Sequence, residues 1–144
     1  MDRDDIFVSL SYRVSINKKS AQVIFLDDNE DLRELLPVLL QTALEVECKC
    51  FASLAELEGD AEEALHAKVA ILDINLGSDA SDGVDALRWL RAHKFKGKIV
   101  FFTGHARTNP HVEQAEKSGI EILEKPLHAD RLISFVERAM NGKR

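Results

Sequence analysis

The chain has 144 residues, the length of a single domain, and 45% hydrophobic with 31% charged residues is the balance of a globular protein. Its formal charge of -6 argues against a protein that binds the phosphate backbone of nucleic acids. No apolar run approaches the roughly 18 residues of a membrane helix. The start Met1–Asp5 is acidic where a secretory signal is basic, so we expect a cytoplasmic protein without membrane contact.

Residues 1–20 differ from the rest of the chain. Apolar and polar residues alternate from Ile6 to Ile16, which is the period of a strand with one apolar face, and residues 17–20 are typical of a turn. The segment could add to a sheet edge, pair with a second copy, derive from a cloning vector or be disordered. We treat 1–20 as an N-terminal extension and 21–144 as the domain.

From residue 21 onward, short apolar runs alternate with helical patterns. The runs at 23–26 and 69–72 are continuous, which is typical of strands buried on both faces. Five strand-and-helix units predict an α/β fold, a doubly wound parallel sheet with helices on both faces. The predicted strands are 23–26, 46–51, 69–72, 99–102 and 120–123, and helical periods follow at 32–43, 54–65, 84–90, 112–115 and 132–140.

Three local features refine these elements. Asp28 or Asn29 can cap the first helix, and Gly59 weakens the second and favours a shorter one. Cys48 and Cys50 share one face of the second strand but lie too far apart to bridge easily, so we expect two reduced thiols.

Polar residues close four of the five strands. Asp27 with Asp28 follows the first strand, Asp73 the third, Thr103 the fourth and Lys125 the fifth. The carboxyl ends of parallel strands meet at one edge, where such sheets bind ligands. Each residue alone has an ordinary explanation, as a helix cap or a turn. Together, three carboxylates favour a hard cation such as Mg²⁺, and the hydroxyl and ammonium suit phosphate oxygens.

With these residues in this order, the chain resembles the receiver domain of two-component response regulators over about residues 21–141. The resemblance implies a flavodoxin-like sheet with strand order 2-1-3-4-5. It is carried by four motifs, Ile24–Asp28, Ile71–Asn75, Phe101–His105 and Glu124–Pro126.

The resemblance implies a role for each acidic residue. Asp73 matches the aspartate that accepts the phosphoryl group. Asp28 matches a direct Mg²⁺ ligand, and Asp27 one that acts mainly through water. Asn75 matches the position whose backbone carbonyl binds the metal, and Mn²⁺ is an alternative ion.

The resemblance also implies which residues respond to the phosphoryl group and form the family's conformational switch. Thr103 matches the hydroxyl that closes on the phosphoryl group, and Lys125 matches the lysine that pairs with it. The Lys125–Pro126 bond is a candidate for a cis peptide. Ile122 occupies the position where the family often has an aromatic residue, and it is not aromatic here.

Two side chains match positions that control water near the acceptor, namely Asn75 and His105. We expect His105 to make loss of the phosphoryl group depend on pH. The loop 73–83 is about two residues longer than is usual in the family, and Gly77 stands where a proline is common.

The expected function is a phosphorylation-dependent signalling module that takes its phosphoryl group from a histidine kinase or histidine phosphotransfer protein. We expect no enzymatic activity beyond self-catalysed phosphoryl transfer and slow autodephosphorylation. The chain stops soon after its fifth helix, so output is expected through protein contact. The expected face combines the helix around 112–115, the strand 120–123 and the helix 132–140, in a monomer or weak dimer.

Two other functions fit these residues less well. A phosphatase of the haloacid dehalogenase type also places an aspartate nucleophile after an apolar strand, but it needs a second aspartate where this chain has Asn75. A flavodoxin-like binding module would need a glycine-rich phosphate loop after the first strand, where this chain has Asp27 and Asp28.

Overall fold

The computed structural model describes residues 21–74, 82–104, 112–126 and 128–142. No helix within these ranges is long and apolar enough to cross a membrane. The elements along the chain are β1 (Val23–Leu26), α2 (Glu30–Leu44), β2 (Cys48–Phe51), α3 (Leu54–Gly59), α4 (Ala61–Ala64), β3 (Val69–Leu72), α5 (Gly83–Ala92), β4 (Lys98–Thr103), α6 (Val112–Lys117), β5 (Ile122–Glu124) and α7 (Ala129–Met140).

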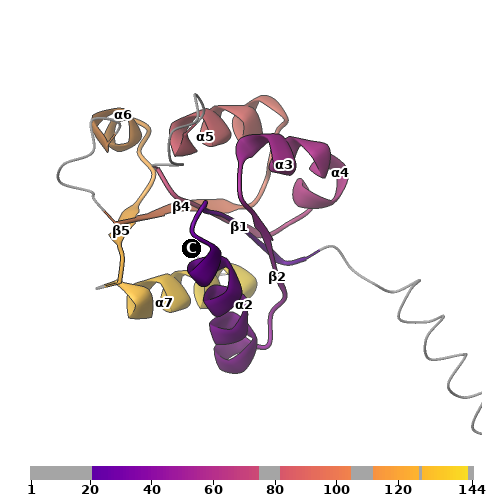
Figure 1. Cartoon of the computed structure of the whole chain (residues 1–144), viewed down its shortest axis with the longest axis vertical. Coiled ribbons are helices and arrows are strands. Elements are labelled where there is room, and N and C mark those ends of the chain that lie inside the picture. The colour runs from indigo at the N-terminus through magenta and orange to yellow at the C-terminus, as the bar shows by residue number, and fades with distance from the viewer. Residues whose placement is uncertain (1–20, 75–81, 105–111, 127, 143–144) are drawn as a thin grey trace, which may run out of the picture.

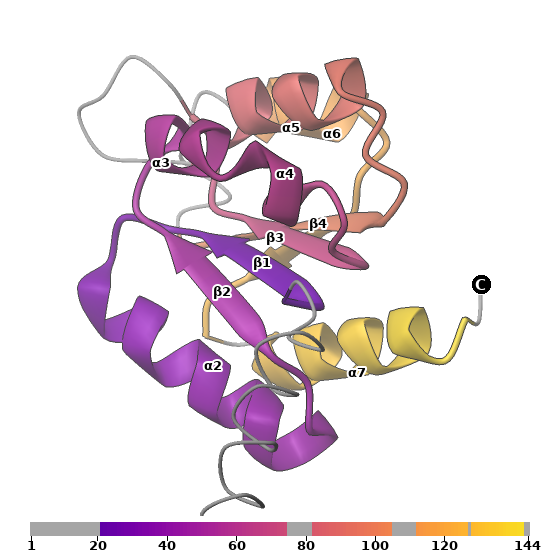
Figure 2. The ribbon, with the colours of Figure 1, turned by 90° about the vertical axis from the view of Figure 1, so that its right-hand side faces the viewer.

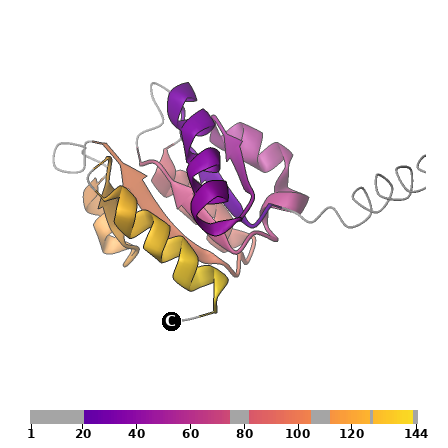
Figure 3. The same ribbon diagram turned by 90° about the horizontal axis from the view of Figure 1, so that it is seen from below.

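The strands form one parallel sheet in the order β2-β1-β3-β4-β5, which confirms the predicted fold and strand order. Helices α3, α4, α5 and α6 cover one face of the sheet, and α2 and α7 cover the other (Figures 1 and 2). Figure 3 shows α2 and α7 together over their face. This arrangement leaves the carboxyl ends of the strands at one edge of the sheet.

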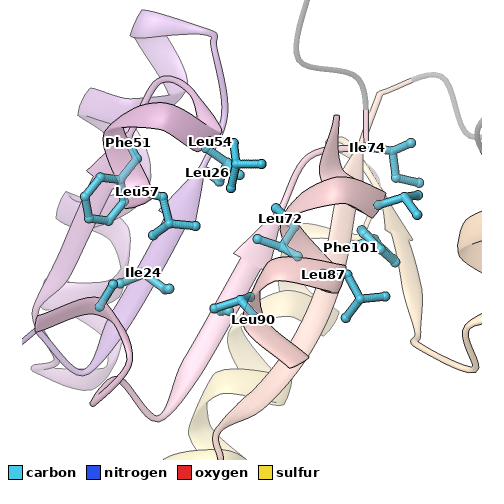
Figure 4. Packing of buried hydrophobic residues seen from close by; sticks show 14 of the residues in the cluster. Ile24, Leu26, Phe51, Leu54, Leu57, Leu72, Ile74, Leu87, Leu90 and Phe101 are labelled. Atoms are coloured by element: carbon cyan, nitrogen blue, oxygen red, sulfur yellow. The ribbon is translucent and has the colours of Figure 1, made fainter. Parts of the chain in front are cut away.

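Alternation along the buried strands supplies a core on each side of the sheet. In β1, Ile24 and Leu26 pack with α3, α4 and α5, whereas Val23 and Phe25 pack with α2 and α7. The continuous apolar runs of β1 and β3 are buried at every position, as predicted. The first core draws on four helices and is shown in Figure 4.

Polar side chains set where the helices begin. The Asn29 side chain accepts a hydrogen bond from the third residue of α2, so Asn29 is the cap, not Asp28. Asp82 and Asp85 form a reciprocal capping box at the start of α5. The predicted second helix is divided after Gly59 into α3 and α4.

Strand ends differ from the predicted ones by one or two residues. The last strand was expected over 120–123 and lies over Ile122–Glu124, because Phe101, Phe102 and Thr103 of β4 are its ladder partners. Strand length in a parallel sheet depends on the neighbouring strand, which the apolar run of one strand does not reveal.

Gly83, the first residue of α5, lies against the backbone that follows β3. A Cβ at Gly83 would lie 2.3 Å from the carbonyl oxygen of Asp73 and 2.8 Å from the Cα of Ile74. Gly83→Ala is therefore expected to destabilise the protein by about 1–3 kcal/mol, measured by urea denaturation.

Gly59→Ala is the matched control, since a Cβ there meets nothing within 4 Å. It lies in α3, so it is expected to stabilise the protein by roughly 0.5–1 kcal/mol. Equal effects of the two substitutions would contradict the close approach of Gly83 to the Asp73 backbone.

Candidate functional site

Four of the predicted polar residues lie together at the carboxyl edge of the sheet. Asp27 follows β1, Asp73 follows β3, Thr103 ends β4 and Lys125 follows β5. Asp27, Asp73 and Thr103 are the buried polar residues of the described chain, with exposed fractions of 0%, 5% and 1%. Burial of this many polar groups demands partners for them.

A single ammonium group joins the two buried carboxylates. Lys125 Nζ contacts Asp27 Oδ2 and also lies 3.3 Å from Asp73 Oδ2. The Lys125 side chain is only 14% exposed. Among the described residues, two negative charges thus share this one positive charge, which leaves a net negative charge in a poorly solvated place.

Neighbouring groups hold Asp27 in its position. Its Oδ1 accepts a hydrogen bond from the backbone N–H of Asn29 at 2.8 Å, and its carbonyl oxygen accepts one from Arg33 Nη1 at 3.0 Å. Sequence reasoning did not connect Arg33 with the site. Its place one turn into the helix that follows the acidic pair was the available signal.

Asp28 completes a group of three carboxylates. One oxygen atom each from Asp27, Asp28 and Asp73 lies within 4.8 Å of the others, and Asp28 is exposed whereas the other two are buried. Such an oxygen-only set suits Mg²⁺ or Mn²⁺ rather than a metal that prefers sulfur or imidazole. The unbalanced buried charge also fits a cation here, so the residues present are compatible with the metal.

The surroundings of Asp73 change its acidity. Burial raises the pKa of Asp73, the nearby Lys125 ammonium lowers it, and the Asp27 carboxylate raises it, with a result of about 6. A carboxyl group with such a pKa is still ionised at neutral pH, but its ionisation lowers the free energy of unfolding.

The remaining predicted residues take up different places. Thr103 Oγ1 is buried and makes no hydrogen bond of normal geometry within the described chain. The Lys125–Pro126 peptide bond is cis. Ile122 begins β5 opposite Phe101 and is half-buried. Asn75, Gly77 and His105, with most of the long loop, lie outside the described residues.

Comparison with known proteins finds one matching family model and related regulatory proteins. A family model described as the response regulator receiver domain matches residues 23–137. The nitrogen assimilation regulatory protein NtrX of Azorhizobium caulinodans is 26% identical over 129 residues, which is 85% of this chain and 26% of that protein. The regulatory protein AtoC of Escherichia coli is 25% identical over 121 residues, 83% of this chain and 25% of that protein. The chain therefore spans about a quarter of the length of these curated relatives.

Solved structures share the fold. The receiver domain of NtrX from Brucella abortus has a TM-score of 0.65 with 26% identity, over 83% of this chain and 98% of that one. A response regulator receiver domain protein from Clostridium thermocellum has a TM-score of 0.69 with 24% identity, over 85% of this chain and 95% of that one, and shows the fold alone.

The unbalanced charge predicts a stabilising substitution. In chelator, Asp73→Asn is expected to raise the free energy of unfolding by about 1 kcal/mol or more, because it removes one of two carboxylates that share Lys125. Since the fold raises the pKa of Asp73 from 3.8 to about 6, the native protein keeps this proton longer than the unfolded chain. Wild-type stability should thus fall relative to the variant as pH rises from about 4 to about 6.

Denaturant melts of both proteins across this pH range measure the difference. Asp130→Asn, which changes an exposed carboxylate at the start of α7, is the control and should bring no comparable gain. A clear loss of stability in Asp73→Asn would mean that Asp73 is a structural partner of Lys125.

Proposed function

The chain belongs to the response regulator receiver domain family, and from this premise we propose that it accepts a phosphoryl group on Asp73 in an Mg²⁺-dependent reaction. The family is a signalling module of two-component systems. The observation that carries the proposal is the contact of Lys125 with the buried Asp27 and Asp73, with Asp28 beside them, at the carboxyl edge of the sheet.

The proposed reaction is transfer from a phosphohistidine. An oxygen of the Asp73 carboxylate forms a bond to phosphorus while the bond between phosphorus and the imidazole nitrogen breaks, and that nitrogen keeps the electron pair. A bound Mg²⁺ ion, held by Asp27, Asp28 and Asp73, would supply positive charge for the phosphoryl oxygens. Asn75 would add its backbone carbonyl.

Lys125 and Thr103 would hold the transferred group. Lys125 already contacts Asp73 Oδ2, so its ammonium can pair with a phosphoryl oxygen after a small shift. The buried Thr103 hydroxyl has no hydrogen bond of normal geometry in the described chain and can donate one to the same group. The Lys125 ammonium and the Thr103 hydroxyl would both stabilise the negative charge of the phosphorylated form.

Partners and lifetime follow the family in this proposal. A histidine kinase or histidine phosphotransfer protein would be the phosphodonor, and α6, β5 and α7 would form the output face of a monomer or weak dimer. Ile122 would occupy the aromatic position of the switch, and Asn75 and His105 would control access of water to the phosphoryl group.

Intact mass measures the proposed modification directly. With Mg²⁺ and acetyl phosphate, the wild-type protein is expected to gain one phosphoryl group, and Asp73→Asn is expected to gain none. Asp130→Asn is the matched control on α7 and should be labelled like the wild type. Labelling of Asp73→Asn, or steady turnover of a generic phosphate ester as by a phosphatase, would contradict the proposal.

Metal binding has its own test. Mg²⁺ is expected to raise the melting temperature, because it neutralises the carboxylate group of Asp27, Asp28 and Asp73. Asp28→Ala should abolish that rise, whereas Asp31→Ala, an exposed carboxylate in the first turn of α2, should leave it unchanged. An undiminished response in Asp28→Ala would remove Asp28 from the metal site.

A further inference from the structure

A second concentration of charge lies at the opposite edge of the sheet, and its sign is positive. A cavity of about 600 Å³ opens where β3 and β4 begin and α7 ends. This volume lies within the range of small-molecule sites. Its lining includes four lysines and one histidine but no acidic residue, and consists of Leu65, His66, Ala67, Lys68, Lys94, Lys96, Gly97, Lys98 and Ala139.

Backbone contacts bring the lysines together from two separate loops. Lys68 precedes β3, and Lys98 begins β4, where it lies opposite Val69. The backbone N–H of Lys98 donates a hydrogen bond to the Lys68 carbonyl oxygen at 2.8 Å. A Cβ at Gly97 would lie 2.6 Å from that same oxygen, so the loops touch at this point. The sheet therefore fixes the spacing of the Lys68 and Lys98 backbones.

The four ammonium groups have no acidic partner among the described residues. Lys68, Lys94, Lys96 and Lys98 are exposed, and none forms an ion pair with a carboxylate in the ranges that the structure describes. By contrast, Lys49 pairs with two acidic side chains at another surface. The chain has 25 acidic and 19 basic residues. A cavity lined by four lysines and no acidic residue is therefore not expected from composition alone.

We propose that this cavity, which we name the lysine cavity, binds a small anion that carries two or more linked phosphate groups. Lysine is a common phosphate ligand because its ammonium acts as a compact positive charge with three donors. Several lysines around one cavity match a ligand with several negative charges better than a single phosphate. The apolar wall of Leu65, Ala67 and Ala139 can accept an organic group attached to the phosphates.

The lysine cavity is separate from the site at Asp73. Lys68 and Asp73 flank β3 at its two ends, so roughly 15 Å of strand lies between them. A concave site favours a compact ligand over a nucleic acid, whose backbone needs an extended basic surface and meets a chain of formal charge -6.

Calorimetry with inorganic triphosphate tests the proposal on the full chain in chelator, with no divalent metal at the acidic site. Wild type is expected to bind saturably, and the double substitution Lys96→Gln with Lys98→Gln should weaken binding by about tenfold or more. Lys96→Arg with Lys98→Arg keeps the charge and should retain binding. Because these side chains are exposed, folding is checked simply by thermal melting.

Arg88→Gln with Lys117→Gln removes the same charge from exposed positions on α5 and α6 and should bind like the wild type. The amide NMR signals of Gly97 and Lys98 should shift with triphosphate along the same saturation curve.

Three results would overturn the lysine cavity as a phosphate site: no saturable binding by the wild type, unchanged binding by the Lys96→Gln with Lys98→Gln variant, or equal weakening in the Arg88→Gln with Lys117→Gln control. A parallel titration with ATP identifies the source of the phosphates. Tighter binding of ATP than of triphosphate would support a nucleotide, and equal binding would support the phosphate chain alone.

Discussion

The contact of one half-buried ammonium with two buried carboxylates organises this molecule. Lys125 follows β5, and its side chain reaches past the end of β4 to Asp73 after β3 and Asp27 after β1. The pairing is incomplete in charge, since two carboxylates share one ammonium. The excess negative charge lowers the stability of the fold, and the same charge favours binding of a cation.

The parallel sheet makes the arrangement attainable. Every strand runs in the same direction, so residues that follow the strands gather at one edge and residues that precede them gather at the other. At the first edge the chain places acidic groups around Lys125, and at the second it places lysines around a cavity. The molecule is thus polarised along its strands, although its overall charge is acidic.

This polarity has a functional meaning under the proposals made above. Transfer to Asp73 would add negative charge at an edge that already carries it, and Lys125, Thr103 and a bound cation would offset that charge. The other edge has positive groups without acidic partners in the described chain. The two edges are joined by buried strands with close-packed cores on both faces, which hold them at a fixed separation.

The sequence by itself determined the sheet, its strand order through the family resemblance, and the residues that gather at its acidic edge. Continuous apolar runs and the polar residues that end them are local signals, and a parallel sheet leaves only one place for them to meet. Only the tertiary structure decided that Lys125 bridges Asp27 and Asp73, and that Asp28 stays exposed. Side-chain contacts depend on how neighbouring strands align, and sequence spacing carries no record of that alignment.

The lysine cavity is the clearest feature that only the tertiary structure decided. Lys68 is one lysine before an apolar run, and Lys94, Lys96 and Lys98 look like a solvated loop when they are read along the chain. They form one surface because β3 and β4 are neighbours with Val69 opposite Lys98. Local patterns specify elements through short-range propensity and burial, whereas charges distant in sequence are brought together only when the strands pair.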